Sequence, residues 1–537
     1  MAAIVSSKNG TNKELFPWIF LLAGVITRIP FSSQFLLHMD SGQFVLALNN
    51  YDVTVHQPHP PGYFLYVMLG RVIHLFVNDG NAVFVSISVF FSGLTMVVVY
   101  RLGKEMFDTN TGAIATLLTL TSPNVWFHGE VALTYIVEAF FSTAIAFFCW
   151  KIINGEEKFV YISAIVLGIA GGIRQNTVVF LLPLWIYSIR NITRRRIFVS
   201  FMMLGGTILV WFIPMIHMSG GWDSYLDALR ELWIFHTGGH SFYRGGWASL
   251  RIFAFVLLLY LVYGLGAGIF PLGLSFYSLI RRRNFRLLDT KKVIFIALWV
   301  LPSMFFYLFV FISVQNPGYV LILLPAFFLV TSYSVVYLGK ELAARYRKNA
   351  SPWILLVLMA LNITMFFSFN TPVSYPWIKQ HDRELALLLK DIRTFDPGKT
   401  AIFVNNYIYY SYRHFMVYLP QYRVYNVDVR ESSSGERRKT FWGIRGKTHL
   451  TGGITLPADV RQFVSPLDIA DNKYWENKAY ESAGIQIKDV SSSLRVASGS
   501  VDLVEYLYPD LMVTNTRRKI TMVERVGKIE GGRKRWR

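Results

Sequence analysis

The sequence predicts a polytopic α-helical membrane protein that carries a soluble α/β domain at its C-terminal end. Hydrophobic residues make up 53% of the 537-residue chain and charged residues 16%, a balance that is unusual for a soluble protein. Apolar runs of about 20 residues, the length that a bilayer core requires, recur between Phe16 and Phe369. From Asn370 onward the composition is mixed and more polar. We therefore expect a membrane domain over residues 1–370 and a soluble domain over residues 371–537.

The apolar runs predict about eleven transmembrane helices. The first run follows a polar start and lacks a small-residue cleavage pattern, so we expect it to remain in the membrane. The expected spans are 16–34, 82–100, 112–128, 131–150, 159–174, 176–190, 197–216, 252–279, 293–313, 319–338 and 353–370.

Clusters of Lys and Arg predict the orientation of these spans. With eleven spans every cluster falls on one side, which the positive-inside rule makes cytoplasmic. The N-terminus is then cytoplasmic and the domain 371–537 extracytoplasmic. The clusters are Lys8 with Lys13, Arg101 with Lys104, Lys151 with Lys158, 190–196, 281–292 and 339–348.

Two outer loops are expected to be long, at about 35–81 and 217–250. The first contains an apolar segment, 61–77, which is short and carries Arg71 and His74. Counting this segment as a span would move the basic clusters to opposite sides, so we interpret it as a helix that lies in the outer membrane interface. The second loop predicts another interfacial helix, which begins near Asp223.

The C-terminal region combines strand and helix patterns. "KTAIFVNN" and "YRVYNVDV" predict strands, and 377–395 predicts a helix. Cys149 is the only cysteine, which excludes an internal disulfide and a thiolate metal cluster.

Asp40, in "LLHMDSGQF", stands where the first apolar run meets water. A carboxylate at the edge of the hydrocarbon loses hydration, which is unfavourable unless it has a partner or a task. One interpretation is a helix cap or an ion pair at the interface. The other interpretation is that Asp40 takes part in the function of the protein, and the residues that follow in the sequence favour this second interpretation.

The strip "VHQPHPPGYF" places His56 and His59 among prolines that stiffen the chain. Such histidines can donate to a phosphate or bind a metal. The alternative is that they satisfy backbone carbonyls, and two histidines with no third ligand nearby in sequence are a weak metal signal.

Further charged residues lie at the outer ends of later spans. Glu130 begins the fourth span, where the helix dipole alone would favour a carboxylate. Glu138 lies deeper, where it either pairs with another helix or faces a cavity. Arg174 and Arg244 are cations on the outer face; each either binds an anion or reaches towards lipid headgroups.

Carboxylates, histidines and arginines at one membrane depth suit acid–base chemistry beside an anionic leaving group. The sequence has no P-loop and no G-x-G-x-x-G on a strand-to-helix turn, so a nucleotide site is not expected, nor is a nucleic-acid partner. A lipid donor with its phosphate at the interface would fit.

The chain resembles the GT-C membrane glycosyltransferases, in particular the group of dolichyl-phosphate-mannose-protein mannosyltransferases and lipid A aminoarabinose transferases. The resemblance covers about residues 20–370. The segments that carry it, in order, are "HMDSGQF", "HPPGY", "VWFHGEVALTYIVEAFF", "GIRQNTVVFLLPLW" and "QNPGYVLILLPAF".

The resemblance implies an inverting transferase that takes a sugar from a polyprenyl-phosphate donor. Asp40 corresponds to the general base and Glu130 to the second acidic position of the family. His59 corresponds to a donor-phosphate contact, with Arg174, His56 and Arg244 as further candidates.

The sequence departs from the family in two ways. Many of the mannosyltransferases have an Asp-Glu pair in the first loop, whereas Ser41 follows Asp40 here, and no sugar-binding repeat domain follows the membrane part. A protein acceptor is therefore not favoured over a lipid or a glycan. Oligosaccharyltransferases, which hold a metal with several acidic residues, fit poorly, and we expect no obligatory metal or other cofactor.

Two other functions are compatible with the composition. One is a transporter or lipid flippase, although the two repeated halves typical of such proteins are not evident. The other is a polymer-assembly or anchoring protein whose basic outer domain binds anionic glycan. For the transferase, a bacterial inner membrane is the expected location, with membrane lipids around the spans.

Overall fold

The chain folds into two compact units in this computed structural model. The first unit consists of Met1–Gln34 and Ala47–Lys379, and the second of Phe35–Leu46 and Gln380–Arg537. The structure describes residues 10–238, 241–282, 289–346, 349–404, 408–431, 437–442, 449–450, 462–465, 486–489, 495–499 and 520–524. The division lies close to the expected boundary after residue 370, but a stretch of the first outer loop, Phe35–Leu46, groups with the C-terminal unit. Of the basic clusters, Lys8, residues 283–288 and residues 347–348 lie outside the described residues.

The first unit is helical. Its helices begin with α2 (Gly10–Ile26), η1 (Ile29–Phe31), η2 (Val53–Val55), α4 (Phe64–His74), α5 (Gly80–Met106), α6 (Thr109–Thr121), α7 (Pro123–His128), α8 (Tyr135–Ile153), α9 (Phe159–Ile173) and α10 (Asn176–Ile189). They continue with α11 (Arg194–Met218), α12 (Trp222–Gly238), α13 (Phe242–Leu265), η3 (Gly266–Gly268), α14 (Ile269–Arg282), α15 (Thr290–Phe309), η5 (Pro317–Ile322), α16 (Leu324–Tyr346) and α17 (Ser351–Ser368). The helices α3 (Met39–Asn49) and α18 (Tyr375–Ile392) each continue from one unit into the other.

Each expected span overlaps with helix, and several spans are divided between two elements, two of them for visible reasons. Span 112–128 is divided between α6 and α7, because Ser122 caps a new helix in front of Pro123. Span 252–279 is divided between α13 and α14 at Gly266, whose φ of 54° favours glycine. The side chain of Asn362 accepts a hydrogen bond from the amide of Ala267 at 2.8 Å, so this backbone N–H keeps a partner where the helix is interrupted.

Among the described residues, six helices are long and apolar enough to cross a membrane by length and composition. They are Gly80–Met106, Tyr135–Ile153, Arg194–Met218, Phe242–Ser278, Thr290–Phe309 and Ser351–Ser368. Other expected spans correspond to shorter apolar helices, such as α9 and α10. The chain is thus an integral membrane protein, while the number of eleven spans stays a prediction.

Both segments that are expected to lie in the membrane interface are helical, and their location at the interface stays a prediction. The helix α4 has 11 residues, which gives a length of about 16 Å against the roughly 30 Å of a bilayer core. It buries Tyr66 and Val67 but exposes Leu75 and Phe76 just beyond its end, as expected for a helix on an apolar surface. The helix α12 similarly exposes Trp233.

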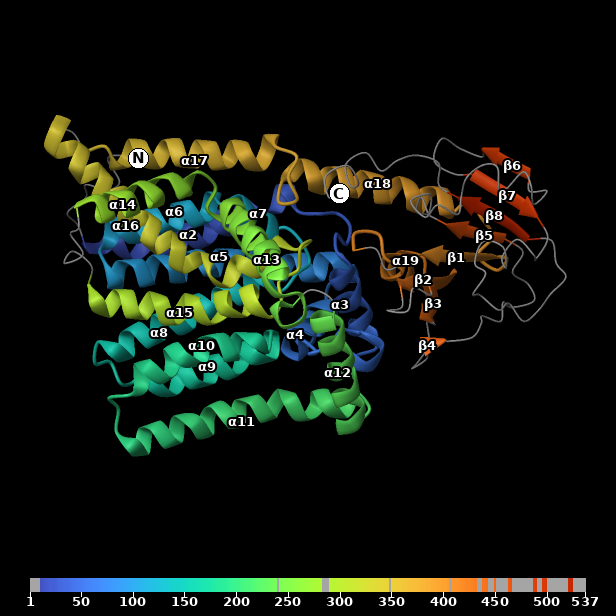
Figure 1. The fold of residues 1–537 in the computed structure, drawn as a ribbon, viewed down its shortest axis with the longest axis horizontal. Coiled ribbons are helices and arrows are strands. Elements are labelled where there is room, and N and C mark those ends of the chain that lie inside the picture. The colour runs from blue at the N-terminus through green and yellow to red at the C-terminus, as the bar shows by residue number, and fades with distance from the viewer. Residues whose placement is uncertain are drawn as a thin grey trace. The chain divides into compact units, whose positions relative to one another are not determined.

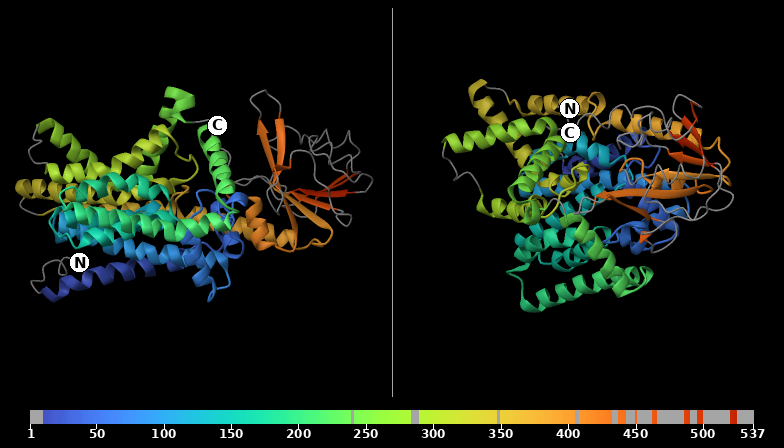
Figure 2. Two further views of the ribbon diagram at one scale, coloured as in Figure 1. Left: turned by 90° about the horizontal axis from the view of Figure 1, so that it is seen from below. Right: turned by 45° about the vertical axis from the view of Figure 1, so that its right-hand side comes forward.

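The long helix α5 packs against α2, α6 and α8 in the middle of the first unit. By contrast α11 lies at the edge of the helix group, as Figure 1 and the right-hand view of Figure 2 show. It exposes Met202, Val210 and Ile213, which suits a face that contacts lipid.

The second unit contains a mixed sheet. In the described part of the chain the sheet has the strand order β4-β3-β2-β1-β5-β8-β7-β6. Strand β1 is parallel to both β2 and β5, and β2 and β3 form an antiparallel pair. The strands are β1 (Thr400–Val404), β2 (Arg423–Glu431), β3 (Arg437–Trp442), β4 (His449–Leu450), β5 (Gln462–Ser465), β6 (Gln486–Asp489), β7 (Arg495–Gly499) and β8 (Ile520–Glu524). The expected strands correspond to β1 and β2, and the expected helix to α18.

An amphipathic helix covers this sheet. The apolar stripe of α18, which includes Leu385 and Leu389, packs with Ile402 of β1 and Val424 of β2. Phe415 of α19 (Tyr412–Tyr418) completes the cluster. The core of the second unit is therefore built between α18, α19 and the two strands that the sequence predicts.

Candidate active site

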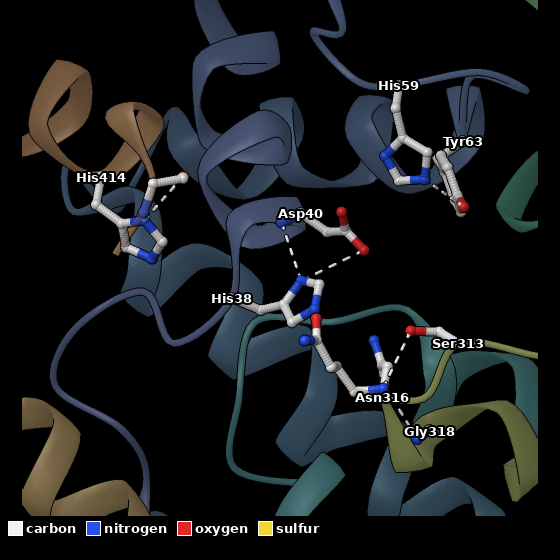
Figure 3. A network of polar contacts seen from close by, with 10 residues as sticks. His38, Asp40, His59, Tyr63, Ser313, Asn316, Gly318 and His414 are labelled. Atoms are coloured by element: carbon white, nitrogen blue, oxygen red, sulfur yellow. Dashed lines mark hydrogen bonds and ion pairs between the residues drawn. The ribbon is translucent and has the colours of Figure 1, made fainter. Parts of the chain in front are cut away.

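Asp40 lies in the first turn of α3, where the helix dipole favours a negative charge. Its backbone N–H donates to Nδ1 of His38 at 3.1 Å, so the His38 ring caps the helix. The same nitrogen lies 3.4 Å from a carboxylate oxygen of Asp40 (Figure 3). Burial lowers the pKa of His38 below its usual value, although the charge of Asp40 opposes the shift. The ring nitrogen of His38 that accepts from the Asp40 amide is therefore not expected to carry a proton at neutral pH.

The second unit gathers two more buried histidines. His381 of α18 and His414 of α19 lie with their ring centroids 6.3 Å apart, and Nε2 of His381 donates to the carbonyl of Tyr409 at 2.9 Å. Burial lowers the pKa of His381 to about 4. Burial, together with the neighbouring His381 and His38, lowers the pKa of His414 well below its usual value.

The strip His56–Tyr63 is held in place in the first unit. His59 Nε2 lies 2.9 Å from the hydroxyl of Tyr63, and the two ring centroids are 4.8 Å apart (Figure 3). Tyr63 is the residue directly before α4 and has a φ of 46°, an uncommon conformation for a bulky side chain. His56 ends η2 in a left-handed conformation, and its amide donates to the carbonyl of Val53.

Side chains from other elements fix the carbonyls of this strip. Tyr51 donates its hydroxyl to Gly62 O at 2.6 Å, and Gln175 donates to Pro61 O at 2.9 Å. Tyr225 of α12 donates to the same carbonyl of Pro61 at 3.1 Å. The strip is therefore anchored to the start of α10 and to α12 as well as being stiffened by its prolines.

Arg174 forms a buried ion pair with Glu138. Its guanidinium lies 3.3 Å from a carboxylate oxygen of Glu138, and Thr177 donates to the other carboxylate oxygen at 3.0 Å. The same guanidinium stacks over the rings of Tyr135 at 4.3 Å and Tyr319 at 5.1 Å. Of the two alternatives for Glu138, pairing with another helix is the one observed. Arg174 is 5% exposed and so does not extend to lipid headgroups.

Glu130 belongs to a second buried cluster. It accepts a hydrogen bond from the indole of Trp126 at 2.6 Å, and Arg28 lies over the Trp126 ring at 4.5 Å. Among the described residues its other carboxylate oxygen has no hydrogen-bond partner. Burial raises the pKa of Glu130 well above its usual value, while the charge of Arg28 and the bond from Trp126 oppose the shift. Glu130 has no exposed surface in this structure.

Sequence reasoning did not single out Arg28. Its side chain is fully buried and donates to Leu120 O at 2.7 Å and to the hydroxyl of Thr27 at 2.7 Å. The available signal was an arginine near the end of an apolar run, which is rare without a partner.

Three of the segments that carry the resemblance meet in the first unit. Asn124 of α7, which directly precedes one of these segments, donates to Pro317 O at 2.9 Å, and the rings of Tyr135 and Tyr319 lie 5.7 Å apart. A Cβ on Gly318 would lie 2.4 Å from the Tyr135 ring and 2.6 Å from the His128 imidazole, so only glycine allows this approach. Arg174 of a third segment stacks on the same two tyrosines. Arg244, in contrast, is exposed in the first turn of α13.

A metal centre is not evident in the part of the chain that the structure describes. There, no group of three or more His, Cys, Asp or Glu side chains could hold a metal ion. The expectation that the protein needs no metal stays a prediction.

Comparisons with known proteins identify the fold. Residues 58–218 match the family model of dolichyl-phosphate-mannose-protein mannosyltransferases. That range includes His59, Glu130 and Arg174 but not Asp40, His56 or Arg244. A comparison with curated proteins finds no match.

Solved structures resemble the chain over most of its length. The crystal structure of ArnT from Cupriavidus metallidurans bound to undecaprenyl phosphate has a TM-score of 0.51 and 12% identity, and covers 96% of this chain and 98% of its own. The apo form has a TM-score of 0.52 and 13% identity, and covers 95% and 97%. The apo oligosaccharyltransferase from Archaeoglobus fulgidus has a TM-score of 0.45 and 14% identity, and covers 77% and 64%. The expected resemblance to GT-C glycosyltransferases is thereby confirmed, and the chain shares the fold of ArnT.

The ion pair predicts the effect of Glu138→Gln. The substitution leaves the Arg174 guanidinium buried without a counter-charge, so we expect the free energy of unfolding to fall by about 3–5 kcal/mol. The matched control is Glu105→Gln, which removes a half-exposed carboxylate from Lys151 and should cost less than about 1 kcal/mol. Unfolding of the purified variants in detergent measures both. Equal losses would contradict the account.

The buried histidines predict an acid-sensitive second unit. The pKa of His381 is about 4 in the folded state and about 6.5 when unfolded, so between these values the unfolded chain takes up a proton that the folded chain does not. The contribution of His381 to the free energy of unfolding is fully present above about pH 6.5. It decreases by about 1.4 kcal/mol for each pH unit between that value and the folded pKa of about 4. Amide hydrogen exchange in α18 measures the fall, and His381→Gln should make it shallower. Identical slopes in the two proteins would refute this assignment.

Proposed function

We propose that the protein is an inverting glycosyltransferase that moves a sugar from a polyprenyl-phosphate donor to an extracytoplasmic acceptor, with Asp40 as the general base. The shared fold supports the transferase class, and ArnT was crystallised with undecaprenyl phosphate, which is the type of lipid that the proposal requires. Because fold does not determine function, the residue argument carries the rest.

The surroundings of three carboxylates single out Asp40. Glu138 is neutralised by Arg174, and Glu130 is fully buried with a raised pKa. Asp40 keeps 15% of its side chain exposed and lies in the first turn of a helix. A base must be accessible to the acceptor, and the helix dipole favours the charged form of a carboxylate in this position. This contrast is the observation that carries the proposal.

The proposed reaction is a single displacement. Asp40 accepts the proton of the acceptor hydroxyl while the hydroxyl oxygen attacks the anomeric carbon of the donor sugar. The bond from that carbon to the phosphate oxygen breaks, and the polyprenyl phosphate leaves with the electron pair. Nothing in this step needs a metal or another cofactor, provided that the protein stabilises the leaving phosphate.

His59 is the best supported of the proposed phosphate ligands. It is half-buried, sits beside the Tyr63 hydroxyl and belongs to an anchored strip. His56 lies in the same strip, and Arg244 is exposed in the other outer loop. Arg174 would have to share its charge between the phosphate and Glu138, so we rank it after the histidines. Glu130 is proposed to support the site as the family's second acidic position.

The remaining features of the proposal follow from the basic clusters and the family. The N-terminus is assigned to the cytoplasm and residues 371–537 to the outer side of a bacterial inner membrane. The acceptor is a lipid, a glycan or a protein. The competing hypothesis is a transporter or flippase that moves lipid without transferring a sugar.

Asp40→Asn separates these hypotheses. It keeps the shape of the side chain but removes the base, so kcat for release of polyprenyl phosphate should fall by about 10²–10⁴-fold while folding and lipid binding remain. The assay uses undecaprenyl-phosphate sugars carrying mannose, glucose or 4-amino-4-deoxyarabinose, with cell-envelope extract as acceptor. The control is Asp79→Asn, an exposed helix cap in the same loop whose new side chain still accepts the Ala82 amide. If the protein is a transporter, the Asp40→Asn and Asp79→Asn variants should have the same activity.

Removal of metal tests the cofactor prediction. Because the proposed step uses only protein side chains, treatment with EDTA should leave the transfer rate within about twofold of the untreated enzyme. Complete loss that added divalent metal restores would show that a metal takes part.

A further inference from the structure

The chain leading into α3 depends on the C-terminal unit for its hydrogen bonds. Residues 35–38 have no regular secondary structure, so their amides need acceptors elsewhere. Phe35 N–H donates to a carboxylate oxygen of Asp382 at 3.2 Å, and Leu36 N–H donates to the hydroxyl of Tyr418 at 2.7 Å. Met39 N–H, at the start of the helix, donates to Ile408 O at 2.6 Å. All three acceptors come from the sequence beyond residue 380.

Side chains on both sides of Asp40 also pack against residues beyond position 380. The Phe35 ring meets the Tyr418 ring edge-on at 5.3 Å, and the His38 ring meets that of Tyr409 at 6.1 Å. On the following turn, a Cβ on Gly42 would lie 2.9 Å from Cβ of Arg413, so α3 lies directly against α19.

These contacts determine how the Asp40 carboxylate is presented. Its helix starts at a residue whose amide is bonded to Ile408, and the ring that caps it packs on Tyr409. A base acts efficiently only when its supporting residues hold it in place, and a displacement of about 1 Å can cost about 10²-fold in rate.

We propose that the C-terminal unit is a positioning device for the transferase base, in which Tyr418 and Asp382 hold the segment that carries Asp40. This role rests on the proposed function of Asp40 and assigns to the C-terminal unit a task other than binding sugar. Tyr418 and Asp382 are positioning residues, since they act through the backbone of Phe35 and Leu36.

The test uses the full-length protein. Tyr418→Phe removes the acceptor for Leu36 and keeps the ring against Phe35, and Asp382→Ala removes the acceptor for Phe35. The conservative Asp382→Asn retains a carbonyl oxygen and should restore the wild-type behaviour. The matched control is Tyr410→Phe, which removes a buried hydroxyl that donates to Glu384 within the same unit.

Two measurements are made on each variant. The first is hydrogen exchange of the amides of residues 35–39, which should become about tenfold faster in the combined Tyr418→Phe, Asp382→Ala protein. The second is turnover of the same undecaprenyl-phosphate sugars, for which kcat should fall at least about tenfold with KM within about twofold. Tyr410→Phe and Asp382→Asn should match the wild type in both.

The outcomes separate this inference from the function on which it rests. Unchanged exchange in the combined variant overturns the positioning role, whatever the activity. Faster exchange with unchanged kcat overturns it too, because the segment would then move without consequence for the base. A wild type that turns over no donor overturns the proposed transferase, and the exchange measurement alone then decides whether the C-terminal unit holds the segment.

Discussion

The hydrogen bonds that the amides of Phe35, Leu36 and Met39 donate to residues far along the chain determine where Asp40 lies, and the proposed chemistry depends on that placement. A loop at the end of a membrane helix has few acceptors of its own, and an amide left unbonded away from water is costly. The C-terminal unit supplies these acceptors through Asp382, Tyr418 and Ile408. The Asp40 segment and these acceptors all belong to the second unit, although several hundred residues separate them in the sequence.

Buried charges inside the first unit are matched by nearby groups. The guanidinium of Arg174 is matched by Glu138 and by two aromatic rings, and Arg28 lies against Trp126 beside Glu130. Such compensation suits groups that hold helices together where water is scarce. Asp40 is instead partly exposed, and the nearby His38 is neutral.

The sequence predicted the features that depend on local patterns, such as the positions of helices and strands. Apolar runs placed the helices, the segment 61–77 contains the short helix α4, and the strand patterns located β1 and β2. The segments of the family resemblance were also found in order, and the shared fold with ArnT confirms that resemblance. The partners of Arg174, Arg28 and the Asp40 segment were not predicted, because they lie up to several hundred residues apart and leave no periodic signal. Asp40 itself lies outside the range of the family match, so its role rests on its surroundings.

The central claim is a single displacement assisted by one base, and the stereochemistry of the product tests it most directly. A single displacement inverts the anomeric carbon, whereas a covalent sugar–enzyme intermediate would retain its configuration. Nuclear magnetic resonance of the product formed from a donor of known anomeric configuration distinguishes the two. The account predicts a product of opposite configuration to the donor. A product of the same configuration would contradict it, because Asp40 would then act as a nucleophile or not at all.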